Sequence, residues 1–191
     1  MTTICLVRHG QTNWNKQTLI QGRLDNKLNE KGLEQAHHVA NILKENDPNW
    51  DIIMYSPLSR AKTTATIIKE TLGFVGPFAA NEEIIEREFG EAEGQFITEE
   101  LYDKIKKDDV AGMEKTIDLQ HRSYKAIMNI AAKYPNDKVL LVSHSHFIKG
   151  FFTFIDKNIT FTSYLPNTSI CYVRINDNKI VDYTFNKEFG K

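Results

Sequence analysis

Arginine and histidine side chains follow three short apolar runs of this sequence. They are Arg8 and His9 after residues 4–7, Arg60 after residues 52–55, and His144 after residues 139–142. An arginine offers a planar fork of N–H donors that fits two oxygens of one anion, which lysine does less well. A neutral imidazole is a nucleophile near pH 7 when its other nitrogen is held as a donor. These residue types together suit the binding and transfer of a phosphoryl group.

A phosphoryl group in transfer carries charge on three oxygens, so its catalysts depend on positioning and on charge stabilisation. We therefore expect Arg8 and Arg60 to hold the oxygens while His9 attacks the phosphorus atom. His144, if protonated, adds a further donor. The leaving alkoxide needs a proton, which a carboxylic acid beside the pocket can provide.

The apolar runs have the pattern of strands in a parallel sheet. Residues 4–7, 52–55 and 139–142 are apolar without alternation, as is typical of strands covered on both faces. Apolar residues at three- and four-residue steps predict helices over residues 30–46 and 61–72. Thr98 can cap a short charged helix over residues 99–107, a longer helix is expected over residues 114–134 before Pro135, and an apolar helix is expected after His146. Residues 169–175 and 179–185, joined across Asn176-Asp-Asn178, predict an antiparallel hairpin.

Strands that alternate with helices predict an α/β fold. We expect one domain over residues 1–191, a three-layer α/β/α sandwich with a mostly parallel central sheet. In open α/β sheets, ligands bind beyond the carboxyl ends of the strands. If the three strands are parallel neighbours, His9, Arg60 and His144 converge on one pocket despite their separation in the sequence.

The composition limits the kinds of partner that we expect this chain to bind. The chain has 191 residues with 24 Lys+Arg against 25 Asp+Glu, so we expect neither a nucleic-acid binder nor a membrane anchor. Cys5 and Cys171 show no motif spacing and are expected to be reduced and buried. Met1-Thr-Thr leads into an apolar run without the features of a signal peptide, which predicts a cytoplasmic protein. A homodimer stays open, because a modest dimer patch cannot be distinguished from other exposed faces.

Several motifs together resemble one family. The segment Leu6-Val-Arg-His-Gly-Gln-Thr-Asn-Trp-Asn15 resembles the N-terminal signature of the histidine phosphatase superfamily, which includes cofactor-dependent phosphoglycerate mutases and small phosphatases. Similar likenesses run through most of the chain, at residues 21–36, 56–65, 84–94, 142–144 and 166–167. The resemblance implies a phosphoglycerate mutase-like three-layer fold, with no metal or other cofactor.

The resemblance also implies roles for individual residues. His9 matches the residue that forms a phosphohistidine, and Arg8, Arg60 and His144 match the groups around its phosphoryl group. Asn15 matches an additional phosphate donor, and Gln21 and Gly22 belong to the segment next to it. Glu86 matches the general acid that protonates the leaving oxygen and then activates water. The nearby Glu82, Glu83, Glu88, Glu91 and Glu93 are expected to form a solvated acidic face.

Two positions bear on substrate binding. Ser145 stands where the family usually has glycine, so its side chain is expected to narrow the pocket unless only its N–H faces the phosphate. Arg87 resembles an arginine that helps mutases to bind substrate. Arg23 and Lys16 are further candidates for a second anionic group on the substrate.

The sequence leaves four functions open. A phosphomonoester hydrolase acting on a small phosphorylated metabolite is preferred, because the chain is short and lacks the inserted segments of the mutases. A phosphoglycerate mutase is the first alternative, and a phosphate-binding regulatory module without catalysis is the second. A metal-dependent hydrolase using His144 and His146 is the third, although no carboxylate with convincing ligand spacing accompanies them.

Overall fold

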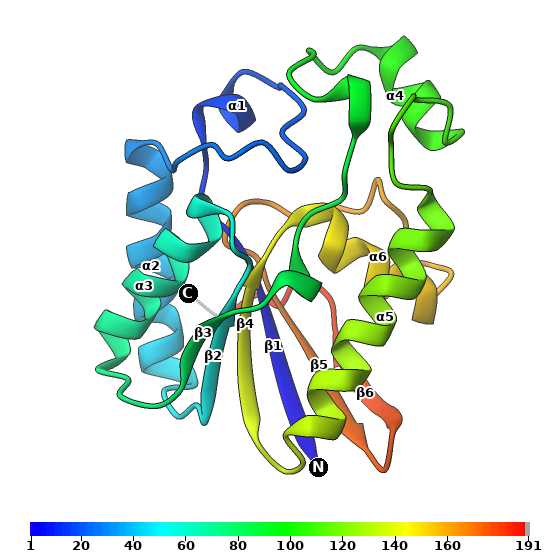
Figure 1. Ribbon diagram of the computed structural model, residues 1–191. Helices are drawn as coiled ribbons and strands as arrows, with labels where there is room; N and C mark the ends of the chain where they lie inside the picture. Colours follow the sequence, from blue (N-terminus) through cyan, green and yellow to red (C-terminus); the bar gives the residue numbers. More distant parts are fainter. Residues whose placement is uncertain (190–191) are drawn as a thin grey trace.

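A six-stranded mixed sheet forms the centre of the molecule (Figure 1). The computed structural model describes residues 1–189. The strands stand in the order β3-β2-β4-β1-β5-β6. Their bounds are β1 Thr2–Arg8, β2 Ile52–Tyr55, β3 Phe78–Ala80, β4 Lys138–Ser143, β5 Ile170–Asn176 and β6 Lys179–Thr184. The first four strands are mutually parallel, and β5 and β6 are antiparallel to their neighbours.

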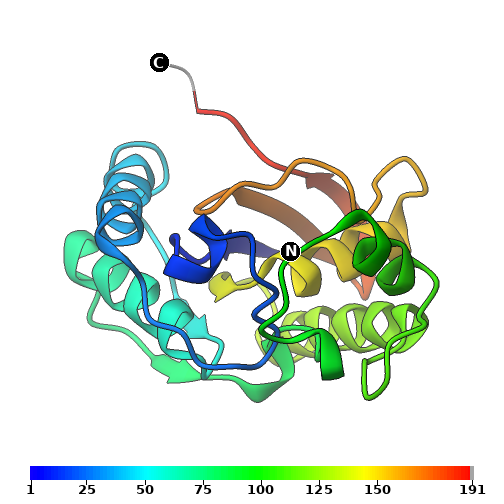
Figure 2. The ribbon, with the colours of Figure 1, turned by 90° about the horizontal axis from the view of Figure 1, so that it is seen from above.

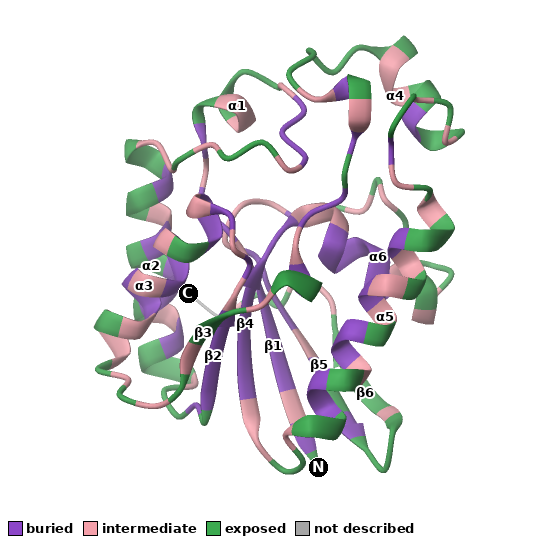
Figure 3. Cartoon of the chain, in the orientation of Figure 1, coloured by how far each residue is buried: buried purple, intermediate pink, exposed green. Residues whose placement is uncertain are grey.

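Helices cover both faces of the sheet (Figures 1 and 2). Helices α2 (Glu30–Asn46) and α3 (Ser59–Leu72) pack on one face, and α5 (Thr116–Lys133) and α6 (Ser145–Ile155) pack on the other. Along β1, Ile4 and Leu6 join the cluster under α5 and α6, whereas Cys5 and Val7 join the cluster under α2 and α3. The strand needs apolar residues at every position because both of its faces are buried (Figure 3).

A smaller layer covers the carboxyl ends of the parallel strands (Figure 1). It contains the short helix α1 (Asn13–Lys16), helix α4 (Glu99–Lys106) and the segments that flank them. Two 3₁₀ turns, η1 (Glu82–Ile84) and η2 (Gly90–Ala92), lead into it. This cap has its own small core of Ile20, Phe89, Ala92, Ile105 and Met113. A pocket at the strand ends therefore lies between the sheet and a separately packed cover.

The predicted α/β/α architecture is confirmed, with small shifts at the element ends. Helix α3 ends before Gly73, whose φ of 64° is the left-handed conformation of a helix C-terminus. The hairpin turn is formed by Asp177 and Asn178, which both have positive φ as a type I′ turn requires. Strand β3 and helix α1 were not expected from the sequence, because three and four residues are too few to show a periodic pattern.

None of the helices formed by residues 1–189 combines the length and the apolar composition that a membrane crossing needs.

Candidate active site

The three predicted strand ends meet at one place in the structure. Strand β4 lies between β1 and β2 and is parallel to both, with Arg8 opposite Ser143 and Tyr55 opposite Val142. His9 and His144 each follow the last residue of their strand, and their ring centroids lie 5.1 Å apart. Arg60 enters from the first turn of α3. The expected convergence of these side chains is therefore present in the fold.

The His9 ring is held in one tautomer. Its Nδ1 lies 2.7 Å from the carbonyl oxygen of Gly10 and must donate, because a carbonyl only accepts. Nε2 consequently keeps its lone pair. Burial, together with the nearby charges of Arg60 and Arg8, holds the His9 pKa well below its ordinary value. The imidazole is therefore neutral at pH 7, as a nucleophile must be.

The backbone at Gly10 fixes the position of this ring. The Gly10 N–H donates to the hydroxyl of Thr64 on α3. A Cβ at Gly10 would lie 2.4 Å from the carbonyl oxygen of Gly32 at the start of α2. Only glycine allows the loop after β1 to approach α2 so closely, so the nucleophile is anchored to both helices of that face.

Arg60 is buried and bonded to neutral carbonyl groups. Its two Nη atoms donate to the carbonyls of Leu24 and Gly22 at 2.8 and 2.7 Å. Gly22 has a φ of 52°, and a Cβ there would lie 1.9 Å from an oxygen of Glu93, so this position requires glycine. Gly22 therefore acts through its carbonyl, which orients Arg60.

Arg8 is held in the same way. One Nη donates to the carbonyl of Leu165 at 2.6 Å, and burial lowers the pKa of Arg8 to about 10, which leaves it charged at pH 7. Within residues 1–189, neither Arg8 nor Arg60 forms an ion pair, and the buried Nε of each has no hydrogen-bond partner. Two guanidinium charges with free donors create a site for an anion.

His144 lies next to His9 but is fully buried and is not itself among the residues that line the pocket. Its Nε2 lies 2.7 Å from the hydroxyl oxygen of Ser56, and its buried Nδ1 has no partner in the described part of the chain. Burial and the charge of Arg60 hold the pKa of His144 well below its ordinary value. The unliganded ring is therefore neutral. It still offers an Nδ1–H donor when the Ser56 hydroxyl donates to Nε2.

Glu86 is the buried carboxylate of this site, with 7% of its surface exposed. Its Oε1 accepts the N–H groups of Phe147 and Arg87, both at 2.9 Å. Its Oε2 accepts the N–H of His146 at 3.2 Å and keeps capacity for another partner. The nearby Glu82, Glu83, Glu88 and Glu91 are exposed, and Glu93 is half-buried but bonded to the cap backbone.

Asn15 and Gln21 line the pocket as polar groups. The Asn15 side-chain oxygen accepts from the N–H of Thr12, and the Thr12 hydroxyl oxygen accepts from the N–H of Asn15, which closes a capping box around α1. The Thr12 hydroxyl in turn donates to the Gln21 side-chain oxygen at 2.8 Å. Because both amide oxygens accept these bonds, the side-chain N–H groups of Asn15 and Gln21 are the donors left for other partners.

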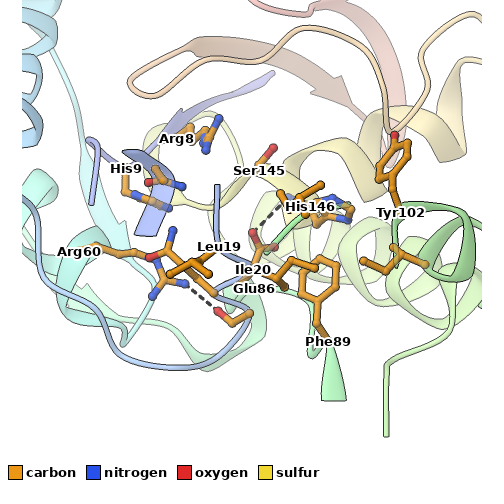
Figure 4. Close-up of a pocket in the computed structure, with 15 residues that line it drawn as sticks. Arg8, His9, Leu19, Ile20, Arg60, Glu86, Phe89, Tyr102, Ser145 and His146 are labelled. Carbon is orange, nitrogen blue, oxygen red and sulfur yellow. Dashed lines mark hydrogen bonds between the residues drawn. The ribbon is translucent and has the colours of Figure 1, made fainter. Parts of the chain in front are cut away.

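Ser145 is the first residue of α6 and lines the pocket with its half-buried side chain. Its backbone is helical and not in the left-handed region, so the local conformation does not require glycine. The hydroxyl adds a polar group at the entrance to the phosphate site (Figure 4).

Arg87, expected as a substrate-binding residue, does not line the pocket. It is 1% exposed, and its guanidinium pairs with Asp108 at 2.7 Å and donates to the Glu114 carbonyl. Asp108 also accepts from the N–H and the hydroxyl of Thr116. Arg87 therefore ties the cap to the start of α5, while its backbone N–H orients Glu86.

Arg23 and Lys16, the other candidates for binding a second anionic group, do not line the pocket either. Arg23 donates to the Glu86 carbonyl and pairs with Glu88, and Lys16 is exposed and does not line the pocket. Residues 1–189 contain no group of three or more His, Cys, Asp or Glu side chains placed to hold a metal ion. The alternative that uses His144 and His146 thus finds no third ligand among the described residues.

The sequence analysis missed the apolar wall of the pocket. The cavity measures about 200 Å³, and beyond the residues described above it is lined by Leu19, Ile20, Phe89, Ile97, Tyr102, Ile105 and His146. The sequence predicts a short charged helix over residues 99–107, and this local pattern does not show that Tyr102 and Ile105 line a pocket. Only the folded cap places these side chains over the phosphate site.

The sequence matches one protein family along nearly its whole length. The model of the histidine phosphatase superfamily (branch 1) matches residues 4–187. The uncharacterized phosphatase PhoE of Bacillus subtilis is 37% identical over all of this chain and 98% of its own length. A metal-independent phosphoserine phosphatase of Arabidopsis thaliana is 33% identical over 95% of this chain and 80% of its own length.

Two solved structures share the fold of this chain over most of its length. Bacillus stearothermophilus YhfR superposes with a TM-score of 0.82 at 25% identity, over 94% of each chain. A mutant phosphoserine phosphatase of Entamoeba histolytica, in complex with phosphoserine, superposes with a TM-score of 0.80 at 25% identity, over 96% of each chain.

The ion pair of Arg87 gives a first prediction. We expect Arg87→Met to lower the free energy of unfolding by about 3 kcal/mol, because it leaves the Asp108 carboxylate without its partner. The dissociation constant of inorganic phosphate, measured by calorimetry, should stay within about twofold of the wild-type value, because the guanidinium does not reach the pocket. Unchanged stability together with weaker phosphate binding would contradict this assignment.

The buried histidines give a second prediction. Burial holds the pKa values of His9, His144 and His146 well below the ordinary value. Below about pH 6.5 the unfolded chain therefore binds protons that the native chain does not. We expect the free energy of unfolding, measured in urea, to fall as the pH is lowered from 7 to 5.

A substitution isolates one of these histidines. His146→Phe should reduce the slope of the free energy of unfolding against pH by up to about 1.4 kcal/mol per pH unit. The matched control is His38→Gln on the exposed side of α2, which should keep the wild-type slope because this side chain is hydrated in both states. Equal slopes in wild type and His146→Phe would contradict the assignment of a buried neutral ring.

Proposed function

Because this chain belongs to the histidine phosphatase superfamily, we propose that it hydrolyses phosphate monoesters through a phosphohistidine on His9. The proposal rests on the state of the His9 ring, whose Nε2 keeps its lone pair. The guanidinium groups of Arg8 and Arg60 lie beside this ring, and neither forms an ion pair with any residue from 1 to 189. The proposed substrate is a small phosphorylated metabolite, and no metal or other cofactor takes part.

In the first step, His9 Nε2 attacks the phosphorus atom as the bond to the ester oxygen breaks. Arg8, Arg60 and the Nδ1–H of His144 bind the three phosphoryl oxygens and stabilise their charge. The step requires Glu86 in its carboxylic acid form. Glu86 then gives its proton to the leaving alkoxide.

In the second step, water replaces the alcohol in the pocket. The Glu86 carboxylate accepts a proton from this water as the water oxygen attacks the phosphohistidine. The bond from phosphorus to Nε2 breaks, and the electron pair returns to His9. The products are inorganic phosphate, the alcohol and the original state of the enzyme.

The structure favours hydrolysis over the mutase alternative. A mutase must hold an intermediate with two phosphate groups, and a second phosphate needs cationic partners of its own. In the described part of the chain, the cationic side chains that line the pocket are Arg8 and Arg60, and both belong to the first phosphate site. The pocket therefore lacks a cationic site for the second group.

The nucleophile is tested by His9→Asn. We expect kcat for 4-nitrophenyl phosphate to fall by at least about 10⁴-fold, because the covalent route is lost. Rapid acid-free quenching of the wild type should trap an acid-labile phosphate on the peptide that contains His9. Chelators should leave the wild-type rate unchanged.

Two controls complete this test. The exposed His38→Asn variant should keep the wild-type rate. Full turnover in His9→Asn would overturn the nucleophile assignment. A wild-type chain that binds phosphate but hydrolyses no ester would instead favour the regulatory-module alternative.

The general acid is tested by Glu86→Gln with two esters. For an alkyl phosphate, whose alkoxide needs a proton, we expect kcat/KM to fall by about 10²–10⁴-fold. For 4-nitrophenyl phosphate the loss should be at least tenfold smaller, because nitrophenolate leaves without a proton. The exposed Glu83→Gln variant is the control. Equal losses for both esters would exclude proton donation by Glu86.

A further inference from the structure

The pocket has two chemically different parts. The inner part is the proposed phosphate site, lined by Arg8, His9 and Arg60, with His144 next to His9. The outer part, here called the outer pocket, is lined by Leu19, Ile20, Phe89, Ile97, Tyr102 and Ile105. Leu19 and Ile20 follow α1, Phe89 and Ile97 lie between β3 and α4, and Tyr102 and Ile105 belong to α4. The cap therefore supplies all six side chains.

Glu86 determines which part receives the leaving group. Its carboxylate lies between the phosphate site and the side chains of Phe89 and Tyr102 (Figure 4). An acid that protonates the leaving oxygen must lie within hydrogen-bond reach of it. The alcohol portion of the ester therefore extends past Glu86 into the outer pocket.

The outer pocket offers no cation to a charged leaving group. Of the nearby basic side chains, Arg87 is paired with Asp108, Arg122 with Glu114, and Lys149 donates to the carbonyl of Phe161. None of them is among the lining residues. A carboxylate or second phosphate on the leaving group would lose its hydration there without gaining an ion pair, which is strongly unfavourable.

His146 adds an aromatic and neutral wall. Its ring stacks on Phe161 with centroids 5.1 Å apart and meets Phe89 edge-on at 4.9 Å. Burial and the charge of Arg87 hold the pKa of His146 well below its ordinary value, so the ring carries no charge at pH 7. Aromatic rings in this arrangement favour another ring or a branched alkyl group as their neighbour.

The entrance of the outer pocket is also apolar. Phe96 and Ile97 are 63% and 50% exposed, and Phe96 pairs with Leu19 in an isolated antiparallel bridge. Exposed apolar side chains that continue an apolar cavity indicate a binding surface for an apolar ligand. The wall and the entrance thus have the same character.

We propose that the natural ester carries an uncharged, apolar alcohol as its leaving group, an aromatic or branched-alkyl group that fills the outer pocket. The inference rests on the proposed function and makes its substrate class more specific. The reaction breaks the bond between phosphorus and the alcohol oxygen and forms the bond to His9 Nε2, and the alcohol leaves with the proton from Glu86. Phosphate monoesters with a carboxylate in the alcohol portion are disfavoured.

A matched pair of esters tests this proposal. Phenyl phosphate and 4-carboxyphenyl phosphate differ by one carboxylate at the far end of the leaving group. We expect kcat/KM for the wild-type chain to be higher for phenyl phosphate, by on the order of 30-fold, since the carboxylate is desolvated without a partner. Phosphoserine and 3-phosphoglycerate should likewise be hydrolysed more slowly than benzyl phosphate.

A charge added to the entrance should change this preference. Ile97→Arg, at an exposed position, should lower the ratio of phenyl to 4-carboxyphenyl phosphate by about fivefold, because it gives the carboxylate a partner in water. Val75→Arg adds the same charge to an exposed loop outside the pocket and should keep the wild-type ratio.

The outcomes separate this proposal from the function on which it rests. A wild-type chain that hydrolyses 4-carboxyphenyl phosphate or phosphoserine as fast as the uncharged esters, with His9 required, overturns the leaving-group proposal and leaves the phosphatase in place. A chain that hydrolyses none of these esters overturns both.

Discussion

Two buried guanidinium groups without carboxylate partners are the feature on which the rest of the site depends. Arg8 and Arg60 are held by the carbonyls of Leu165, Leu24 and Gly22, which orient their N–H groups without neutralising their charge. The nearby Glu86 carboxylate offsets part of this charge without forming an ion pair, and the rest is unfavourable inside a protein until an anion binds. The same charges, together with burial, keep the His9 imidazole neutral and therefore reactive.

The fold supplies the rigidity that this arrangement needs. His9 and His144 follow adjacent parallel strands, so their separation is set by the spacing of the sheet. Arg60 is fixed to α3, and the N-terminus of α6 holds Glu86 through backbone N–H groups. His9, His144 and Arg60 sit at the ends of buried strands and a helix, and Glu86 is fixed by α6. The site is therefore positioned before any ligand arrives.

The cap divides recognition between two surfaces. In the proposed reaction, the ends of β1 and β4 and the first turn of α3 supply the groups that bind the phosphoryl group, which is the same in every substrate. The cap supplies Leu19, Phe89, Tyr102 and their neighbours, which would contact the variable part of the ester. Arg87 joins the two, because its guanidinium holds the base of the cap and its backbone N–H holds Glu86. A change in the cap can thus alter specificity without altering the phosphate site.

The sequence by itself determined the three-layer architecture and the convergence of Arg8, His9, Arg60 and His144. Periodicity encodes which face is buried, and parallel strands bring their carboxyl ends together. Only the tertiary structure decided where Arg87 points and what the apolar side of α4 covers. Both depend on contacts between distant segments, such as Arg87 with Asp108, and local patterns carry no information about such contacts.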